Sequence, residues 1–330
     1  KYTKDTNTRG IIELNLLTGI LFFIVNSIAS FFVNPFLLNN LGSSNFGLWK
    51  SINLYMGFAS FADGRGAQAL KWTIANRESV EDFSNKRRDI ACALIVCLLM
   101  LPFTIIIICA LTYYFPSLIN NIYEVELYLL RIIVFCMGIN LILSSLSSIP
   151  EAILIGTNRN YYSNLIKIFW HLIYVLLLFI ILEFNYSLFG LTIITIATTI
   201  SKGIHNIYLV KRKIKWLGLE RPSKQEIYFF LNFSSLKLLW TIIARFLMSC
   251  EVLIIGYFFS TMLVSNYVFS SFVALIGLNI SGIITYSVTP TLGKIKGSHE
   301  TGKLEDSIKI LREIVFAYSI FIIAIFLMLN

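Results

Sequence analysis

The sequence predicts an all-α membrane protein that crosses the bilayer about nine times. Of the 330 residues, 57% are hydrophobic and 14% are charged, whereas soluble domains contain roughly 45–50% apolar and about 25% charged residues. The apolar residues form blocks of about 20 or more, the length that a helix needs to cross a bilayer. Lysine and arginine gather between alternate blocks, as they do in the cytoplasmic connections of membrane proteins.

Nine apolar blocks are long enough to be transmembrane spans. They comprise residues 11–37, 47–74, 90–114, 126–150, 162–183, 187–210, 227–258, 265–290 and 305–329. Pro35, Pro102 and Pro150 are expected to kink or end their helices, because proline cannot donate a helical backbone hydrogen bond. The first block is long and many others follow it, so it is not expected to be a cleaved signal peptide.

The connections between these blocks alternate in charge. One set is basic and includes Arg9, Arg77, Lys86, Arg87, Arg88, Arg159, Lys211, Arg212, Lys213, Lys215, Lys294 and Lys296. The other set, near residues 39–45, 115–125, 183–187 and 260–265, contains no lysine or arginine. By the positive-inside rule the basic set is cytoplasmic. The N-terminus of this multi-pass protein is therefore expected in the cytoplasm.

The order of these features predicts two pseudo-symmetric lobes joined by a basic linker. Residues 1–210 form an N-terminal lobe of six helices, residues 211–226 a cytoplasmic linker, and residues 227–330 the first three helices of a C-terminal lobe. The blocks that begin near Ile11 and Ile227 share a layout about 220 residues apart, which is typical of transporters built from repeats. Because the chain ends after an odd-numbered span, further helices are expected beyond it.

The second block carries charged residues where a span should be apolar, in the run Ala62-Asp63-Gly64-Arg65-Gly66. On a lipid-facing helix each charge would cost about 2.5–3.5 kcal/mol or more, so both must face protein or water. Residues two apart on a helix do not face each other, so Asp63 and Arg65 can pair only if the glycines break the helix. The run is either an ion-pair staple between helices or a midplane site for substrate phosphate or a coupling ion.

Polar residues recur on one helical face of the first and seventh blocks. In the first block this stripe includes Asn26, and in the seventh it includes Lys237 and Arg245. Hydrogen bonds between helices explain the neutral members equally well, but they do not explain an arginine near the middle of a span. Arg65, Lys237, Arg245, Asn26 and Lys202 are therefore candidate substrate-binding residues.

Membrane-embedded cations outnumber the clearest acids, which are Asp63 and Glu251. Such a balance favours an anionic substrate. Lys202, like Lys167, either faces a cavity or extends its amine to the near surface. Asp63, Glu251 and His171 are candidate ion-coupling residues, because each can gain and lose a proton inside the membrane.

Several other site types lack support in the sequence. The five cysteines lie inside apolar blocks without the paired spacing of zinc or redox sites, so neither a metal nor a cofactor is predicted. The formal net charge of +9 comes from the basic connections rather than from a basic face or an aromatic-basic motif. Nucleic-acid binding is therefore not expected.

The chain resembles the polysaccharide-exporter branch of the multidrug/oligosaccharidyl-lipid/polysaccharide (MOP) superfamily, especially O-antigen flippases of the Wzx type. The resemblance rests on the runs 35–42 (PFLLNNLG) and 46–49 (FGLW), then Asp63-Gly64, then 156–159 (GTNR). It implies twelve or more helices in two six-helix lobes, of which this chain supplies the first lobe and about half of the second, and a location in the bacterial cytoplasmic (inner) membrane. It also implies alternating access and transport of undecaprenyl-diphosphate-linked oligosaccharide in O-antigen, lipopolysaccharide or other surface polysaccharide biosynthesis. The implied partners are this substrate, membrane lipids and other polysaccharide-assembly proteins. Arg65 departs from the apolar residue that the family has after Asp-Gly.

Two other functions compete with this interpretation. A MATE-like exporter of drugs or metabolites would share the fold, but for cationic drugs it should prefer an acidic, aromatic cavity, which the excess of basic residues disfavours. A membrane-bound sugar polymerase or glycosyltransferase would need a catalytic domain, a sizeable outer loop or acidic metal-binding pairs. The sequence contains no Asp-x-Asp motif and its outer connections are short, so the chain is not expected to be an enzyme.

Overall fold

The computed structural model describes residues 3–77, 82–119, 127–184, 188–271, 274, 277 and 301–329, and these residues are almost entirely helical. The long helices are α1 (Thr3–Ala59), α3 (Phe83–Tyr114), α4 (Leu127–Gly156), α5 (Asn160–Glu183), α6 (Leu188–Lys213), α7 (Lys224–Phe258) and α10 (Thr301–Leu329). Shorter elements are η1 (Ser60–Asp63), α2 (Gly66–Asn76), η2 (Phe115–Ser117) and α8 (Thr261–Ser270). The predicted span 265–290 lies mostly outside the described residues.

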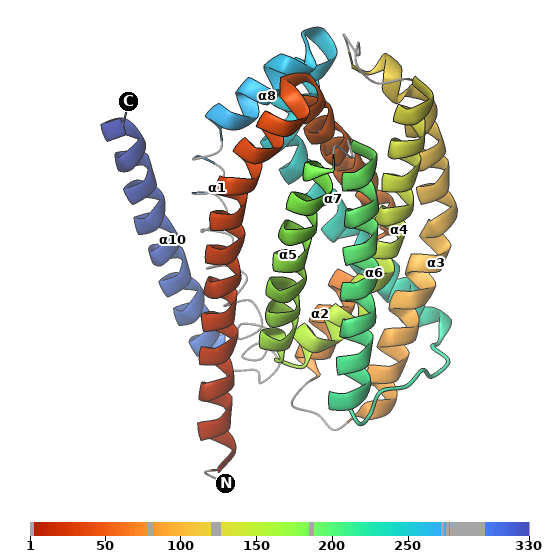
Figure 1. Cartoon of the computed structure of the whole chain (residues 1–330). Coiled ribbons are helices and arrows are strands. Elements are labelled where there is room, and N and C mark those ends of the chain that lie inside the picture. The colour runs from red at the N-terminus through yellow and green to blue at the C-terminus, as the bar shows by residue number, and fades with distance from the viewer. Residues whose placement is uncertain are drawn as a thin grey trace.

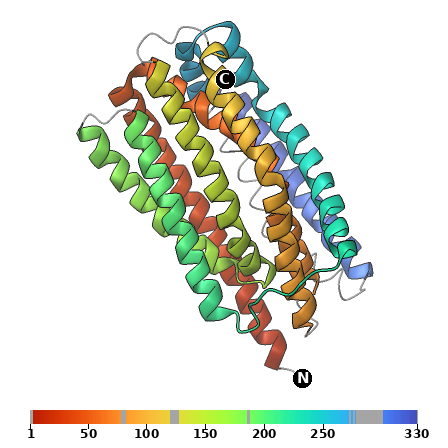
Figure 2. The ribbon, with the colours of Figure 1, turned by 90° about the vertical axis from the view of Figure 1, so that its right-hand side faces the viewer.

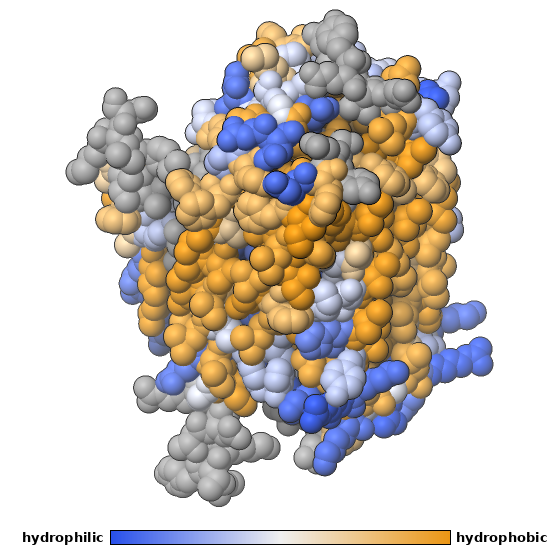
Figure 3. Space-filling view, in the orientation of Figure 1, coloured by the Kyte–Doolittle hydropathy of each residue, from blue (hydrophilic) through white to orange (hydrophobic). Residues whose placement is uncertain are grey.

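Six helical segments within the described residues are long and apolar enough to cross a membrane. Their outward faces carry large apolar side chains, such as Leu98, Ile106, Leu176 and Ile204, each at least 60% exposed. Figure 3 shows this hydrophobic belt, with hydrophilic residues gathered toward the two ends. An exposed apolar surface of this extent requires lipid as its solvent. The chain is therefore an all-α, multi-pass membrane protein.

The first two predicted spans form one continuous helical segment with a kink at Gly42. Gly42 has φ +77° and ψ 164°, a conformation that glycine adopts at no steric cost. Figure 1 shows α1 rising from the N-terminus to the far end of the molecule, where the chain turns back. The outer connection expected near residues 39–45 is therefore a single-residue kink inside a helix.

The three prolines do not end their helices. Pro35, Pro102 and Pro150 lie inside α1, α3 and α4. Transmembrane helices tolerate proline because neighbouring groups satisfy the freed backbone carbonyls. The end predicted for the fourth span at residue 150 is wrong, since α4 continues to Gly156 and carries Glu151 into the bundle.

The basic residues gather at one end of the molecule, here called the basic end, where hydrogen bonds join segments distant in sequence. Arg159 donates to the Lys213 carbonyl oxygen at 2.6 Å, and Arg87 donates to the Trp216 carbonyl oxygen at 2.8 Å. Arg87 also lies 3.2 Å from the Glu220 carboxylate. These contacts fix the linker between α6 and α7 against the start of α3.

Helix α7 packs along the face of the α1–α6 bundle formed by η1, α2, α3 and the second part of α1. Figure 2 shows α7 (teal) running alongside α3 (orange). Trp72 stacks on Phe233, with ring centroids 5.0 Å apart. At the opposite end, α1 approaches α8 so closely that a Cβ on Gly47 would lie 1.9 Å from the Thr261 carbonyl oxygen. Helices α7 and α8 are thus packed against the α1–α6 bundle.

The apolar core of the bundle consists of two clusters. The cluster nearer the Gly42 kink includes Phe46, Ile52, Phe115, Leu130 and Leu188, and the cluster nearer the basic end includes Leu70, Ile74, Val96, Leu154 and Phe230. Along the second span the first cluster ends at Met56 and the second begins at Ala69. Polar residues occupy the level between them, and the candidate site lies there.

Candidate functional site

The second span is broken in its middle at Asp63, Gly64 and Arg65. Helix η1 ends at Asp63, Gly64 (φ +69°) and Arg65 (φ +52°) are left-handed, and α2 starts at Gly66. A Cβ on Gly64 would lie 2.6 Å from Met100, and one on Gly66 2.9 Å from the Ala93 carbonyl oxygen. Both glycines are therefore required for the close approach to α3.

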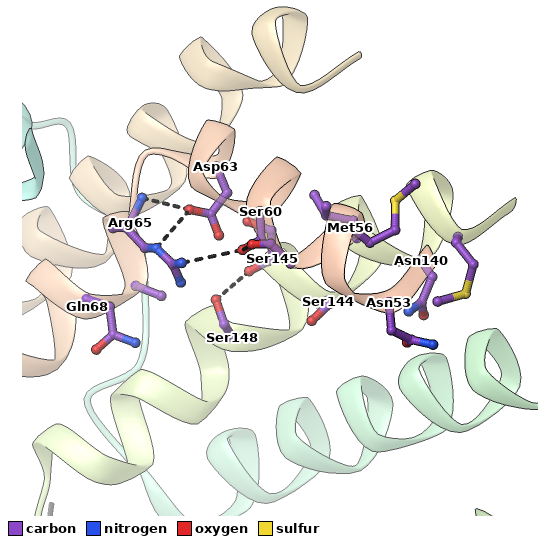
Figure 4. Close-up of a pocket in the computed structure, with 14 residues that line it drawn as sticks. Asn53, Met56, Ser60, Asp63, Arg65, Gln68, Asn140, Ser144, Ser145 and Ser148 are labelled. Atoms are coloured by element: carbon purple, nitrogen blue, oxygen red, sulfur yellow. Dashed lines mark hydrogen bonds and ion pairs between the residues drawn. The ribbon is translucent and has the colours of Figure 1, made fainter. Parts of the chain in front are cut away.

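The break brings Asp63 and Arg65 together, which a regular helix would prevent (Figure 4). The Arg65 backbone amide donates to Asp63 Oδ1 at 2.9 Å, and Arg65 Nε lies 3.9 Å from the same oxygen. The Arg65 guanidinium also donates to Ser60 Oγ at 3.4 Å. One carboxylate thus accepts a hydrogen bond from the backbone of Arg65 and lies within ion-pair distance of its side chain, while Arg65 Nε is buried without a hydrogen-bond partner among the described residues.

This pair borders a cavity of about 300 Å³ between α1, η1, α2 and α4. Most of the residues that line it have polar side chains, namely Asn53, Ser60, Asp63, Arg65, Gln68, Asn140, Ser144, Ser145 and Ser148. Asn140 Oδ1 is buried without a hydrogen-bond partner among the described residues. A buried polar atom without a partner is costly, so this cavity is suited to a polar ligand or water.

Two more cavities continue from the first toward α5 and α6. The second, of about 350 Å³, shares Gln68 and Ser148 with the first, and the third, of about 320 Å³, shares Phe22 and Lys167 with the second. Figure 3 shows a hydrophilic strip entering the hydrophobic belt from the basic end, in the region where Figure 1 places α5 and α6. Because each cavity shares lining residues with the next, the three lie side by side inside the bundle, and together they are here called the polar track.

The second cavity contains a carboxylate surrounded by amines. Lys167 Nζ lies 2.5 Å from Glu151 Oε1, with the side chains 26% and 19% exposed. Lys71 and Lys202 are close enough to act on Glu151 electrostatically. Lys167 therefore does not extend to the surface, which was one of its two predicted arrangements.

The structure places the other predicted residues as follows. Lys202 and His171 line the third cavity, where His171 stacks on Tyr174, and His171 Nε2 is buried without a partner in the described part of the chain. Asn26 is half-buried on α1, one turn beyond Phe22. The side chain of Lys237 lies outside the described residues.

Arg245 comes from α7 and contacts α1 rather than an acid. A Cβ on Gly57 would lie 2.1 Å from Arg245 Nη2, so the guanidinium fits against this glycine, which also lines the first cavity. Arg65 is near enough to repel it. No ion pair joins Arg245 to a carboxylate in the part of the chain that is described; Asp63 pairs with Arg65, and Glu251 lies near Tyr267.

Sequence reasoning missed Lys71, Gln68, Asn140 and Glu151. Glu151 was placed in a connection because Pro150 was expected to end its helix, and Lys71 lies near the predicted end of its span. The run Ser144, Ser145, Ser147 and Ser148 in an apolar block was the one signal that could have indicated a polar lining. Within the described ranges no group of three or more histidine, cysteine, aspartate or glutamate residues could hold a metal ion.

The fold was compared with known proteins. No family model matches the sequence, and no curated protein matches it. Solved structures match closely in shape. An outward-facing multidrug resistance MATE family transporter of the MOP superfamily superposes with a TM-score of 0.72 and 17% identity, over 96% of this chain and 71% of that one. The chain has the fold of the MATE transporters.

Two further solved structures are similar to this chain in fold. The inward-facing conformation of a multidrug resistance MATE family transporter matches with a TM-score of 0.64 and 18% identity, over 95% of this chain and 72% of that one. A MOP superfamily transporter from Pyrococcus furiosus, whose binding pocket has reverse polarity that suggests a different function, matches with a TM-score of 0.71 and 15% identity, over 98% of this chain and 72% of that one. Proteins with this fold thus differ in the charge of their binding pockets.

Proposed function

We propose that the protein is a flippase that moves lipid-linked oligosaccharide across the bacterial cytoplasmic membrane by alternating access. The observation that carries this proposal is the charge of the polar track. Its lining contains four cations, Arg65, Lys71, Lys167 and Lys202, but only two carboxylates, Asp63 and Glu151. In a site of low dielectric constant this excess attracts an anion, such as the diphosphate of an isoprenoid-linked sugar.

The shape of the bundle supports a substrate with a polar head and an apolar tail. The cavities replace the water that diphosphate and sugars lose on leaving the aqueous phase. The exposed faces of α1 and α5, which carry Leu17, Phe32 and Leu176, offer a lipid-like surface close to the track. A head group can therefore move through the track while its isoprenoid tail remains in the bilayer.

Each candidate residue has a role in this proposal. Arg65 and Arg245 bind the diphosphate, since a guanidinium can hold two phosphate oxygens through parallel hydrogen bonds. Asn26 extends the binding surface along α1, and Lys237 remains a candidate substrate-binding residue from its position in the sequence of the seventh span. Asp63, with Glu251 and His171 as further candidates, exchanges a proton or cation during the cycle.

A MATE-like exporter of drugs or metabolites is the second candidate, and the fold itself supports it equally. Cationic drugs would meet the positive track unfavourably. The Pyrococcus transporter shows that a reversed pocket polarity occurs on this fold. The charge of the transported molecule therefore separates the two functions.

Export of surface polysaccharide by variants tests the residue roles. Asp63→Asn keeps the size of the side chain but removes its charge, so export should stop while the protein still reaches the membrane. Arg245→Ala should also stop export, with little change in melting temperature, because no buried acid in the described part of the chain depends on Arg245. Normal export by either variant would exclude the role assigned to that residue.

Sidedness is part of the same proposal. The N-terminus and the basic end face the cytoplasm, because lysine and arginine concentrate there. In intact cells an impermeant thiol reagent should label a cysteine at position 45 or 260 and leave one at position 87 or 213 unlabelled. Labelling at position 213 would reverse the assigned orientation.

A further inference from the structure

A group of four charged residues in the second and third cavities, here called the lysine pocket, has more positive charge than its own acid can neutralise. The pocket consists of Lys71 on α2, Glu151 on α4, Lys167 on α5 and Lys202 on α6. Glu151 is paired with Lys167 and lies within electrostatic range of Lys71 and Lys202. Lys167 and Lys202 against the one carboxylate of Glu151 already leave a positive charge, and a phosphate group is an anion that such a charge attracts.

The pocket has the space and the polar lining that an anion needs. The second cavity measures about 350 Å³, and Asn15, Gln68, Asn160 and Asn164 line it beside the charged residues. Lys202 is only partly exposed and forms no ion pair within 4 Å among the described residues. An ammonium held inside the membrane without a close anion is unfavourable, so an incoming anion would gain from meeting it.

We propose that the lysine pocket binds a phosphate or diphosphate group, and that Glu151 is a resident counter-ion which the incoming anion displaces from Lys167. Without ligand, Glu151 reduces the cost of holding three amines close together inside the bundle. With ligand, the phosphate oxygens take over the contact with Lys167. Because Glu151 competes for the same amine, the anion is bound weakly enough to leave again.

The position of the pocket makes it the first binding station on the polar track. Lys167 lies seven residues after the start of α5 at Asn160, which places it about 10 Å inside the basic end at 1.5 Å per residue. Gln68 and Ser148 then connect the second cavity to the first, which holds Asp63 and Arg65. An anion that enters from the basic end therefore meets the lysines before Arg65.

The identity of the physiological anion rests on the proposed function, but the pocket itself can be tested without transport. Inorganic diphosphate is titrated by calorimetry into the purified full-length protein in detergent. Lys202→Gln is compared with Lys211→Gln, which makes the same change on the exposed end of the same helix. Lys202→Gln should weaken diphosphate binding about tenfold or more, as expected for one charge-assisted hydrogen bond, while Lys211→Gln should leave it unchanged.

The variant Glu151→Gln distinguishes a displaceable counter-ion from a structural ion pair by whether diphosphate binding becomes tighter or weaker. A resident counter-ion predicts that this variant binds diphosphate more tightly than the wild type and gains more melting temperature on adding diphosphate. A purely structural ion pair predicts a lower melting temperature with unchanged or weaker binding, and that result would overturn the inference. Equal affinities of Lys202→Gln and Lys211→Gln would overturn it as well. Lys202→Arg, which keeps the charge, should retain binding.

The outcome also separates this inference from the proposed function. If diphosphate binding depends on Lys202 and Glu151 and yet the protein fails to move lipid-linked oligosaccharide in vesicles, that result would support the lysine pocket as an anion site and exclude the flippase function. If the wild type moves lipid-linked oligosaccharide but does not bind diphosphate, the flippase function would stand and the lysine pocket would be excluded as an anion site.

Discussion

Arg65 is held in a backbone conformation that side-chain-bearing residues rarely adopt. Its φ is +52°, and such a conformation costs a residue with a Cβ roughly 1–2 kcal/mol. Asp63 offsets this cost by accepting the Arg65 amide and facing its guanidinium. The strained backbone has a consequence for the site, because the left-handed turn places the Arg65 side chain at the first cavity. A straight helix would direct this side chain elsewhere.

Two substitutions at this position separate the side chain from the backbone. Arg65→Gly and Arg65→Ala both remove the guanidinium, so both should lose export. Glycine adopts a positive φ without strain, so Arg65→Gly should be more stable than Arg65→Ala by about 1 kcal/mol, measured by thermal unfolding in detergent. Equal stabilities would contradict the strain at Arg65, and normal export by Arg65→Gly would contradict the role of its guanidinium.

At the scale of whole elements, the linker between α6 and α7 is held by charged contacts at the basic end. Ser84 donates to the Glu220 carboxylate at 2.5 Å, and Arg87 lies 3.2 Å from it. The hydrogen bond from Ser84, and then Arg87, lower the pKa of Glu220 below its ordinary value of 4.5. The stacking of Trp216 on Phe83 adds an apolar contact. The linker is therefore docked rather than free.

Acid should release this linker. Because the pKa of Glu220 is lower in the folded protein than in the unfolded chain, its contribution to stability is complete above pH 4.5 and is lost as pH falls through the folded pKa. Amide hydrogen exchange in residues 214–222, corrected for intrinsic rates, should rise as pH falls in this range. Glu220→Gln should show the fast exchange already at neutral pH, whereas Lys215→Gln, exposed in the same linker, should not. Unchanged protection in Glu220→Gln would show that other contacts hold the linker.

The sequence predicted helices better than it predicted where they bend. Hydropathy identified the spans of α5, α6 and α7 within a few residues, because a bilayer demands a long apolar block. It also identified the end of α3, but this helix starts at Phe83, before the predicted start at residue 90. It did not show that Gly42 alone turns α1, since the φ that a glycine adopts depends on its neighbours. It also ended the fourth span at Pro150, because the groups that satisfy a freed carbonyl lie elsewhere in the chain.

The candidate site was predictable only in part, because apolar blocks reveal the charges inside them but not the charges near their ends. Asp63 and Arg65 stood out because a charge inside an apolar block has few explanations. Glu151 and Lys71 lie near the ends of apolar blocks, where charges are ordinary, so only the packing of α2, α4, α5 and α6 reveals that they meet. The contact of Arg245 with Gly57 joins residues 188 positions apart, and no local pattern encodes it.

At the scale of the whole molecule, a MATE-type fold encloses a polar track with an excess of positive charge. The track starts at the lysine pocket near the basic end and reaches the broken helix at Asp63 and Arg65. Two apolar clusters lie on either side of this polar level and hold the bundle together. We propose that this positive track selects an anionic lipid head group.

Selectivity for an anionic lipid head group can be measured with the full-length protein reconstituted in liposomes. Isoprenoid-diphosphate-linked oligosaccharide, labelled on its sugar, is placed in one leaflet, and its appearance in the other is followed beside a cationic drug in the same vesicles. The wild type should move the diphosphate lipid faster than it moves in protein-free vesicles. Arg65→Ala and Lys202→Gln should slow this movement, and the drug should not be transported. Transport of the cationic drug without movement of the diphosphate lipid would contradict the proposed selectivity.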